Sequence, residues 1–157
     1  MRHHVLLIAA ALAACAPPHA ATTATNAATS TASPAAFVIN DLAEHDGDIQ
    51  GCSVMLSRAD ARPSAGDIFR EDGVESGAKG FVRIDGALIQ VDLVRSDQNE
   101  KGGTRTFADK THATQIVETL TTGAAHQESD SVEQSGTLAV THNGATQTLR
   151  VAGGTAC

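Results

Sequence analysis

The pair Asp85-Gly86 stands between two stretches in which apolar and polar residues alternate. An Asp-Gly pair favours the type I′ turn of a tight β-hairpin, so we predict a hairpin over residues 78–93. One face of this hairpin is wholly apolar and pairs Ile84 with Ala87, Val82 with Ile89, Gly80 with Val91 and Ala78 with Leu93. The other face pairs Arg83 with Leu88, Phe81 with Gln90 and Lys79 with Asp92. A shift of one residue would mix the two faces, so the turn and the alternation specify the same register.

A second hairpin is predicted around Asn143-Gly144, which is another type I′ signal. Its inner face pairs Leu138 with Leu149, Val140 with Gln147 and Gly136 with Val151. Its outer face carries Thr137, Ala139 and Thr141 on one strand and Thr146, Thr148 and Arg150 on the other. Threonine-rich strands of this kind are typical of an antiparallel sheet with one solvated side.

Shorter segments complete the pattern. We expect strands over residues 49–57, from residue 66 onward and over 104–108, with loops over 59–66 and 96–103. Residues 113–122 are ambiguous, because four apolar residues fit one helical face whereas the β-branched residues favour a strand. The surrounding β pattern favours the strand. The predicted fold class is all-β, a small antiparallel barrel or sandwich of seven or eight strands.

The N-terminal residues have the layout of an export signal. Arg2 supplies a positive charge, residues 5–14 are apolar but too few to span a bilayer, and the segment ends Leu12-Ala13-Ala14-Cys15. These last four residues resemble the lipobox of bacterial lipoproteins, which implies cleavage after residue 14 and attachment of diacylglycerol and an acyl chain such as palmitate to Cys15. Ala16, in place of Asp, implies a position on the periplasmic face of the outer membrane. An ordinary secretory signal with a chance cysteine is the alternative.

Residues 16–35 contain no Leu, Ile, Val, Met or Phe. A segment of this Ala-, Thr- and Pro-rich composition cannot bury apolar surface, so we predict a disordered linker over residues 15–36. All 14 glycines lie after it. Residues 37–157 show no internal repeat and no second change in composition, and we predict that they form a single β-domain.

Three cysteines are present, and Cys15 is assigned to lipid. Cys52 and Cys157 are then an even pair in a chain exported to an oxidising compartment, so we predict a disulfide between them. This bond would close a loop of about 105 residues and stabilise the fold by at most about 4.7 kcal/mol. A reactive thiol is the alternative, but neither cysteine has a CxxC partner or an adjacent histidine.

Charge and aromatic content exclude several functions. The formal net charge is −7, and Trp and Tyr are absent. Nucleic-acid binding is excluded, because it depends on a basic surface or on aromatic stacking. The domain's histidines lack the spacing of a metal site, and no nucleophile motif occurs; they are His45, His112, His126 and His142. We therefore expect no enzymatic activity, no metal and no cofactor.

Two resemblances concern the domain itself. Gly51-Cys52, Ile84-Asp85-Gly86 and the closing segment 153–157 resemble small uncharacterised disulfide-closed β-domains of bacterial lipoproteins, over the whole of residues 37–157. That family carries no known chemistry. The stretch Ser76-Gly77-Ala78-Lys79 is similar to the Ser-Gly-x-x-Tyr motif of lipid-anchored lysozyme inhibitors, but Gly80 stands in place of the Tyr.

These features together predict a lipid-anchored periplasmic β-domain that acts as a non-enzymatic binding or accessory module of the cell envelope. Its negative charge favours a basic protein partner, with association that weakens as salt rises. The alternative is an inhibitor of a lysozyme or another basic hydrolase, which would depend on an exposed loop such as residues 70–78. A hydrolase would need a pocket with converging polar groups.

Overall fold

The structure is a computed structural model that describes residues 35–157 except 48, 50, 63–64 and 74–75. The export signal, Cys15 and most of the predicted linker lie outside the described residues. Lipid attachment and the disorder of the linker therefore stay predictions. The described residues form strands, turns and loops, and none of them is helical.

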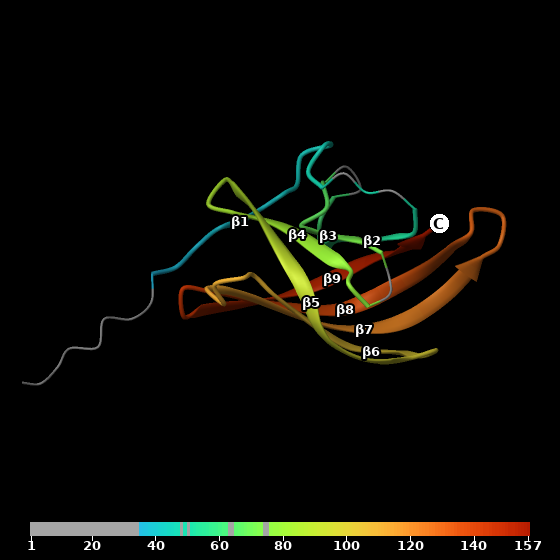
Figure 1. Ribbon diagram of the computed structural model, residues 1–157. Coiled ribbons are helices and arrows are strands. Elements are labelled where there is room, and N and C mark those ends of the chain that lie inside the picture. The colour runs from blue at the N-terminus through green and yellow to red at the C-terminus, as the bar shows by residue number, and fades with distance from the viewer. Residues whose placement is uncertain (1–34, 48, 50, 63–64, 74–75) are drawn as a thin grey trace, which may run out of the picture. The chain divides into compact units, whose positions relative to one another are not determined.

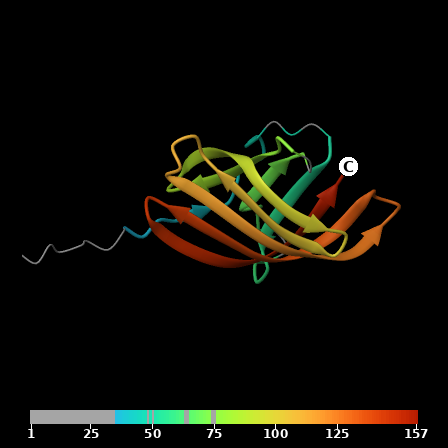
Figure 2. The same cartoon turned by 60° about the horizontal axis from the view of Figure 1, so that its bottom comes forward.

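The strands form one closed antiparallel barrel (Figures 1 and 2). Their bounds are β1 Ile39–Asn40, β2 Ser53–Arg58, β3 Phe69–Asp72, β4 Lys79–Ile84, β5 Ala87–Asn99, β6 Gly102–Ala108, β7 Thr114–His126, β8 Ser131–His142 and β9 Ala145–Ala156. From β2 to β9 each strand pairs with the next one in the sequence, and β9 pairs back with β2. The short β1 pairs with β4 outside this cycle. The predicted all-β fold is confirmed, and of the two predicted alternatives, barrel or sandwich, the structure is a barrel of eight strands with β1 in addition.

Alternate residues of the strands fill the barrel interior, and the strand order brings them together from all sides. The apolar core consists of Phe37, Ile39, Val54, Leu56, Ile68, Phe69, Val82, Ile84, Val91, Phe107, Ile116, Leu120, Leu138, Val140 and Val151. Phe69 and Phe107 meet edge to face, with ring centres 5.4 Å apart. A barrel of eight strands is just wide enough for side chains of this size to fill it.

Both predicted hairpins are confirmed in register. Ile84 lies opposite Ala87 at the first turn, and His142 lies opposite Ala145 at the second. The two turn residues have positive φ in each case, 50° and 82° for Asp85-Gly86 and 48° and 84° for Asn143-Gly144. This is the backbone that a type I′ turn requires, so the dipeptides determine where the chain reverses.

Two sequence predictions need adjustment, and one ambiguous segment is resolved. The expected loop over residues 96–103 is wrong, because β5 continues to Asn99 and pairs with a β6 that already begins at Gly102. These residues are polar because this part of β5 is exposed, not because the chain leaves the sheet. The strand that was favoured for the ambiguous residues 113–122 is confirmed, since residues 114–122 lie in β7. The strand expected from residue 49 begins at Ser53.

The segment between β1 and β2 folds back over the outside of the barrel. Phe81 lies on the outer face of β4, as the hairpin register predicts, yet it is only 9% exposed. Gly47 of this segment packs against its ring, and a Cβ atom at Gly47 would lie 2.6 Å from Phe81 Cδ2. Gly47 also has a φ of 76°, so both the close approach and the backbone require glycine.

Candidate binding recess on the outer face

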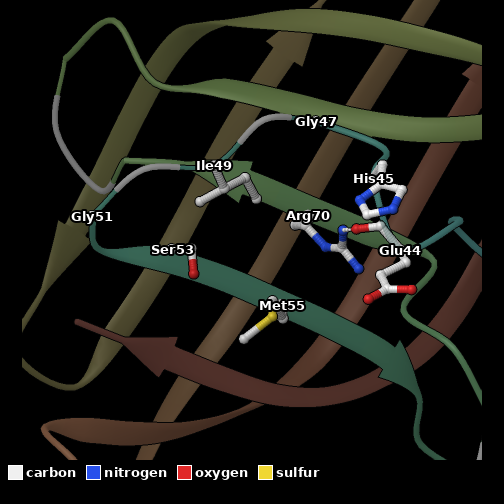
Figure 3. Close-up of a pocket in the computed structure, with 8 residues that line it drawn as sticks. All are labelled: Glu44, His45, Gly47, Ile49, Gly51, Ser53, Met55 and Arg70. Atoms are coloured by element: carbon white, nitrogen blue, oxygen red, sulfur yellow. Dashed lines mark hydrogen bonds between the residues drawn. The ribbon is translucent and has the colours of Figure 1, made fainter.

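A recess of about 510 Å³ lies between this segment and the outer faces of β2 and β3 (Figure 3). The residues that line it are Glu44, His45, Gly47, Ile49, Gly51, Ser53, Met55 and Arg70. We call this hollow the recess. In Figure 3, Ser53 and Met55 extend from β2, Arg70 lies between the segment and β2, and His45 and Glu44 lie at one end.

Strand alternation determines which side chains reach the recess. On β2, Val54 and Leu56 point into the core, so Met55 points outward. On β3, Phe69 points inward and Arg70 outward. Met55 and Arg70 lie directly opposite one another in the β2–β3 register, which brings a thioether and a guanidinium together on the floor of the recess.

Arg70 is held in place by groups on both sides of the recess. Its Nη1 donates to the carbonyl oxygens of Asp46, at 3.1 Å, and Glu44, at 3.4 Å. Its Nη2 donates to the Asp67 carboxylate at 3.0 Å. Its Nε is buried and has no hydrogen-bond partner among the described residues. The guanidinium is thus fixed before any ligand arrives, a condition that lowers the entropic cost of binding.

The segment that covers the recess is pinned by an ion pair between Asp46 and Arg83. Arg83 donates from Nε and Nη2 to the two carboxylate oxygens, at 2.5 and 2.7 Å. The amide of Ala43 donates to the same carboxylate at 2.7 Å. The hydrogen bond from Arg83, together with that from Ala43, holds the pKa of Asp46 below its ordinary value despite its burial. This bidentate geometry fixes the segment on the barrel wall.

The recess combines charged, polar and apolar side chains. Glu44 and His45 are exposed at its end, whereas Ser53 is buried on its floor. Among the described residues, no hydrogen bond joins Ser53 to a histidine, and no group of three or more His, Cys, Asp and Glu side chains could hold a metal ion. A fixed cation beside a methionine and a free carboxylate can recognise a polar and partly apolar surface.

A second polar group lies inside the barrel and was not predicted. Arg105 of β6 lies opposite Glu118 of β7, and both point inward. Arg105 Nη1 contacts Glu71 Oε2 and lies 3.6 Å from Glu118 Oε1. All three side chains are at most 2% exposed. The guanidinium also lies 5.0 Å from the centre of the Phe107 ring, an additional cation–π contact. We call these three charged residues the interior cluster.

Burial changes the ionisation of the interior cluster. It raises the pKa of Glu71 to about 10, with the Glu118 carboxylate adding to the effect and Arg105 opposing it. Burial also raises the pKa of Glu118. A protonated Glu71 carries no charge, which reduces the cost of burying the group. The signal in the sequence was Glu118 itself, since it falls on the same strand face as Ile116 and Leu120.

Of the residues that the sequence singled out, the structure joins the two cysteines and places the histidines apart. Cys52 and Cys157 form a disulfide that joins the C-terminus to the start of β2. His45 lies at the recess, whereas His126 contacts Glu133 at 2.9 Å and His142 contacts Thr114 at 2.9 Å. These three histidines thus lie in three different surroundings.

Gly80 occupies the position at which the resemblance to lysozyme inhibitors would place a Tyr. It faces the core, and a Cβ atom there would lie 2.5 Å from Phe69 Cζ. A tyrosine at this position could not reach a partner, so an inhibitor built on this barrel would need another surface. Within the described residues, no helix is long and apolar enough to cross a membrane. The chain matches no protein-family model, no curated protein and no solved structure.

Proposed function

We propose that this protein is a lipid-anchored, non-enzymatic binding module of the bacterial cell envelope that engages a basic protein partner through the recess. The observation that carries the proposal is the fixed Arg70 beside Met55, with the exposed Glu44 at the end of the same hollow. A hollow formed before binding, with one apolar and several polar groups, favours recognition.

The sequence supports the location and the kind of partner. The lipobox at Leu12-Ala13-Ala14-Cys15 favours attachment to the periplasmic face of the outer membrane. The net charge of −7 favours a basic partner and an association rate that decreases with salt. The rigid barrel then acts as a scaffold that presents the recess above the lipid surface.

The proposal is tested in cells that produce the full lipidated chain with a photo-crosslinking amino acid in place of Glu44. The control places the same amino acid at Leu88, which is exposed on β5 away from the recess. We expect a discrete adduct from the Glu44 position, none from Leu88, and loss of the adduct when Cys15→Ser releases the chain from the membrane. Identical adducts from both positions, or none from either, would contradict the proposal.

Inhibition of a lysozyme is the competing function. The purified full chain is assayed against chicken-, goose- and invertebrate-type lysozymes at low and physiological salt. We expect at most weak association at low salt, because opposite net charges attract without a fitted surface. Inhibition of lysis that persists at physiological salt would replace the proposal with the inhibitor function, and would assign it to residues other than Gly80.

A further inference from the structure

A row of outward-facing residues continues from the recess across the barrel wall. Arg70 on β3 lies opposite Met55 on β2, Met55 lies opposite Gly154 on β9, and Gly154 lies opposite Glu133 on β8. Gly123 of β7 comes next, since its Cβ position lies 3.1 Å from Glu133 Cβ. The row thus holds three side chains and two glycines over five neighbouring strands, a distance of about 19 Å at ordinary strand spacing.

A second hollow of about 290 Å³ lies over this row. It is lined by Met55, Ser57, Asp67, Ser131, Val132, Glu133, Gly153, Gly154, Thr155 and Ala156. Met55 lines both the recess and this hollow, so the two meet at its side chain, which is 37% exposed. At Gly154 a Cβ atom would lie 2.5 Å from the carbonyl oxygen of Val132. Tight strand packing thus keeps the floor free of a side chain. We call the two hollows together the outer groove.

Carboxylates border the outer groove at intervals. Glu44 is exposed at one end and Asp67 lies beside the middle. Glu133, which His126 contacts at 2.9 Å, is 61% exposed at the other end. The positive charge of Arg70 is already opposed by Asp67 at 3.0 Å. A cationic side chain therefore fits this groove, and a lipid phosphate or another polyanion would be repelled.

We propose that the outer groove binds an extended peptide segment of a basic protein, with a Lys or Arg side chain near Glu133 and an apolar side chain against Met55. About six extended residues span the length of the row. The inference rests on the proposed binding function and names the chemistry of the partner. Electrostatic attraction brings the segment to the groove, and burial of its apolar side chain beside the methionine retains it.

The chain contains its own reporter for this site. Its two methionines are Met1 and Met55, so labelling with methyl-¹³C methionine gives one NMR signal from the groove. The full chain carrying Cys15→Ser is titrated at physiological ionic strength with a short peptide in which Lys and Val alternate. A second peptide has Glu in place of every Lys. We expect the Lys peptide to shift the Met55 methyl signal, and the Glu peptide to leave it unchanged.

Substitutions of the two residues that would contact the apolar and the cationic side chain of the peptide should weaken this binding. Met55→Asp and Glu133→Lys are each expected to lower the affinity for the Lys peptide by at least about tenfold. Affinities of all variants are measured by isothermal titration calorimetry, because Met55→Asp removes the methyl reporter. The matched controls are Val94→Asp and Asp97→Lys on β5, whose side chains are exposed as well. The controls should bind as the wild type does, and circular dichroism melts should show that all four variants fold.

Three results would overturn the inference. Equal loss of affinity in the variants and the controls would mean general charge attraction. Binding that leaves the Met55 methyl signal in place would assign the peptide to another surface. Absence of binding by either peptide would refute the peptide chemistry. None of these results depends on the crosslinking from Glu44, so an adduct there with a silent Met55 signal would preserve the binding function and remove only the groove.

Discussion

The substitution Glu71→Gln exchanges a buried carboxyl group for a neutral amide of nearly the same size. Burial and the neighbouring Glu118 raise the pKa of Glu71 from 4.5 to about 10, even though Arg105 opposes the shift. The folded barrel therefore keeps a proton on this group that the unfolded chain releases at neutral pH. Glutamine carries a permanent N–H in that place and can release nothing, so it imitates the protonated form.

The sign and size of the effect follow from linkage. Above the ordinary pKa of 4.5 the folded state binds more protons than the unfolded state, so the free energy of unfolding falls as pH rises. One proton that only the folded state binds lowers the free energy of unfolding by about 1.4 kcal/mol for each unit that the pH rises. The free energy of unfolding therefore falls by about 4 kcal/mol between about pH 5 and about pH 8. Asp46 and Asp109 have pKa values lowered by hydrogen bonds, so their stabilisation is lost only as pH falls through 3.8 and below.

The assay is urea unfolding followed by far-ultraviolet circular dichroism, because the chain has no Trp or Tyr to report by fluorescence. We expect the free energy of unfolding of the wild type to fall from pH 5 to pH 8 by an amount on the order of the loss derived from linkage. The free energy of unfolding of Glu71→Gln should fall far less. At pH 8 the variant should therefore be more stable than the wild type. Glu100→Gln, an exposed turn substitution, is the control and should follow the wild type. A wild type whose stability is constant or rises over this range would refute a protonated Glu71. A Glu71→Gln variant less stable at pH 8 would mean that the carboxylate is the ionised partner of Arg105.

Three further outcomes are expected. Reduction of the Cys52–Cys157 bond frees a loop of 105 residues and should lower the free energy of unfolding by up to about 4.7 kcal/mol, which urea unfolding with and without dithiothreitol measures. Arg105→Met leaves two buried carboxyl groups without their cation and should cost about 3–5 kcal/mol in the same assay; an unchanged midpoint would show that the cation is dispensable. Asp46→Asn should speed hydrogen exchange at the Ala43 amide while the core amides stay protected, and equal exchange would mean that the ion pair does not hold the segment.

The parts of the fold that were predictable are those in which local sequence specifies the partner. Asp85-Gly86 and Asn143-Gly144 determine both the turn and the register, so the pairs predicted over residues 78–93 and 136–151 follow from the sequence. The disulfide between Cys52 and Cys157 was predicted because they are the two cysteines that remain after Cys15 and because an oxidising compartment was expected. Closure of β9 onto β2 was left open between barrel and sandwich, because the two strands are far apart in the sequence.

The sites were not predictable, because they depend on contacts across the barrel. Glu71 and Arg105 are 34 residues apart and meet only when the sheet closes. The inward position of Arg105 was concealed because a polar residue between Thr104 and Thr106 reads equally well as solvent-facing. The recess depends on where the segment after β1 comes to rest, and Phe81 gave no sign that Gly47 would cover it. Alternation identifies which residues share a face, but it does not say what covers that face.

Strand β3 shows how this barrel separates the proposed binding surface from the groups that stabilise the fold. Its four residues place Arg70 in the recess and Glu71, the next residue, in the interior cluster, because neighbouring side chains of a strand point to opposite faces. The same alternation puts Met55 outside and Leu56 in the core. Substitutions on the outer positions can therefore change recognition without a cavity or an uncompensated charge in the core. Loss of binding in Met55→Asp would then report on the groove, whereas loss of folding would be expected only from the inward neighbours.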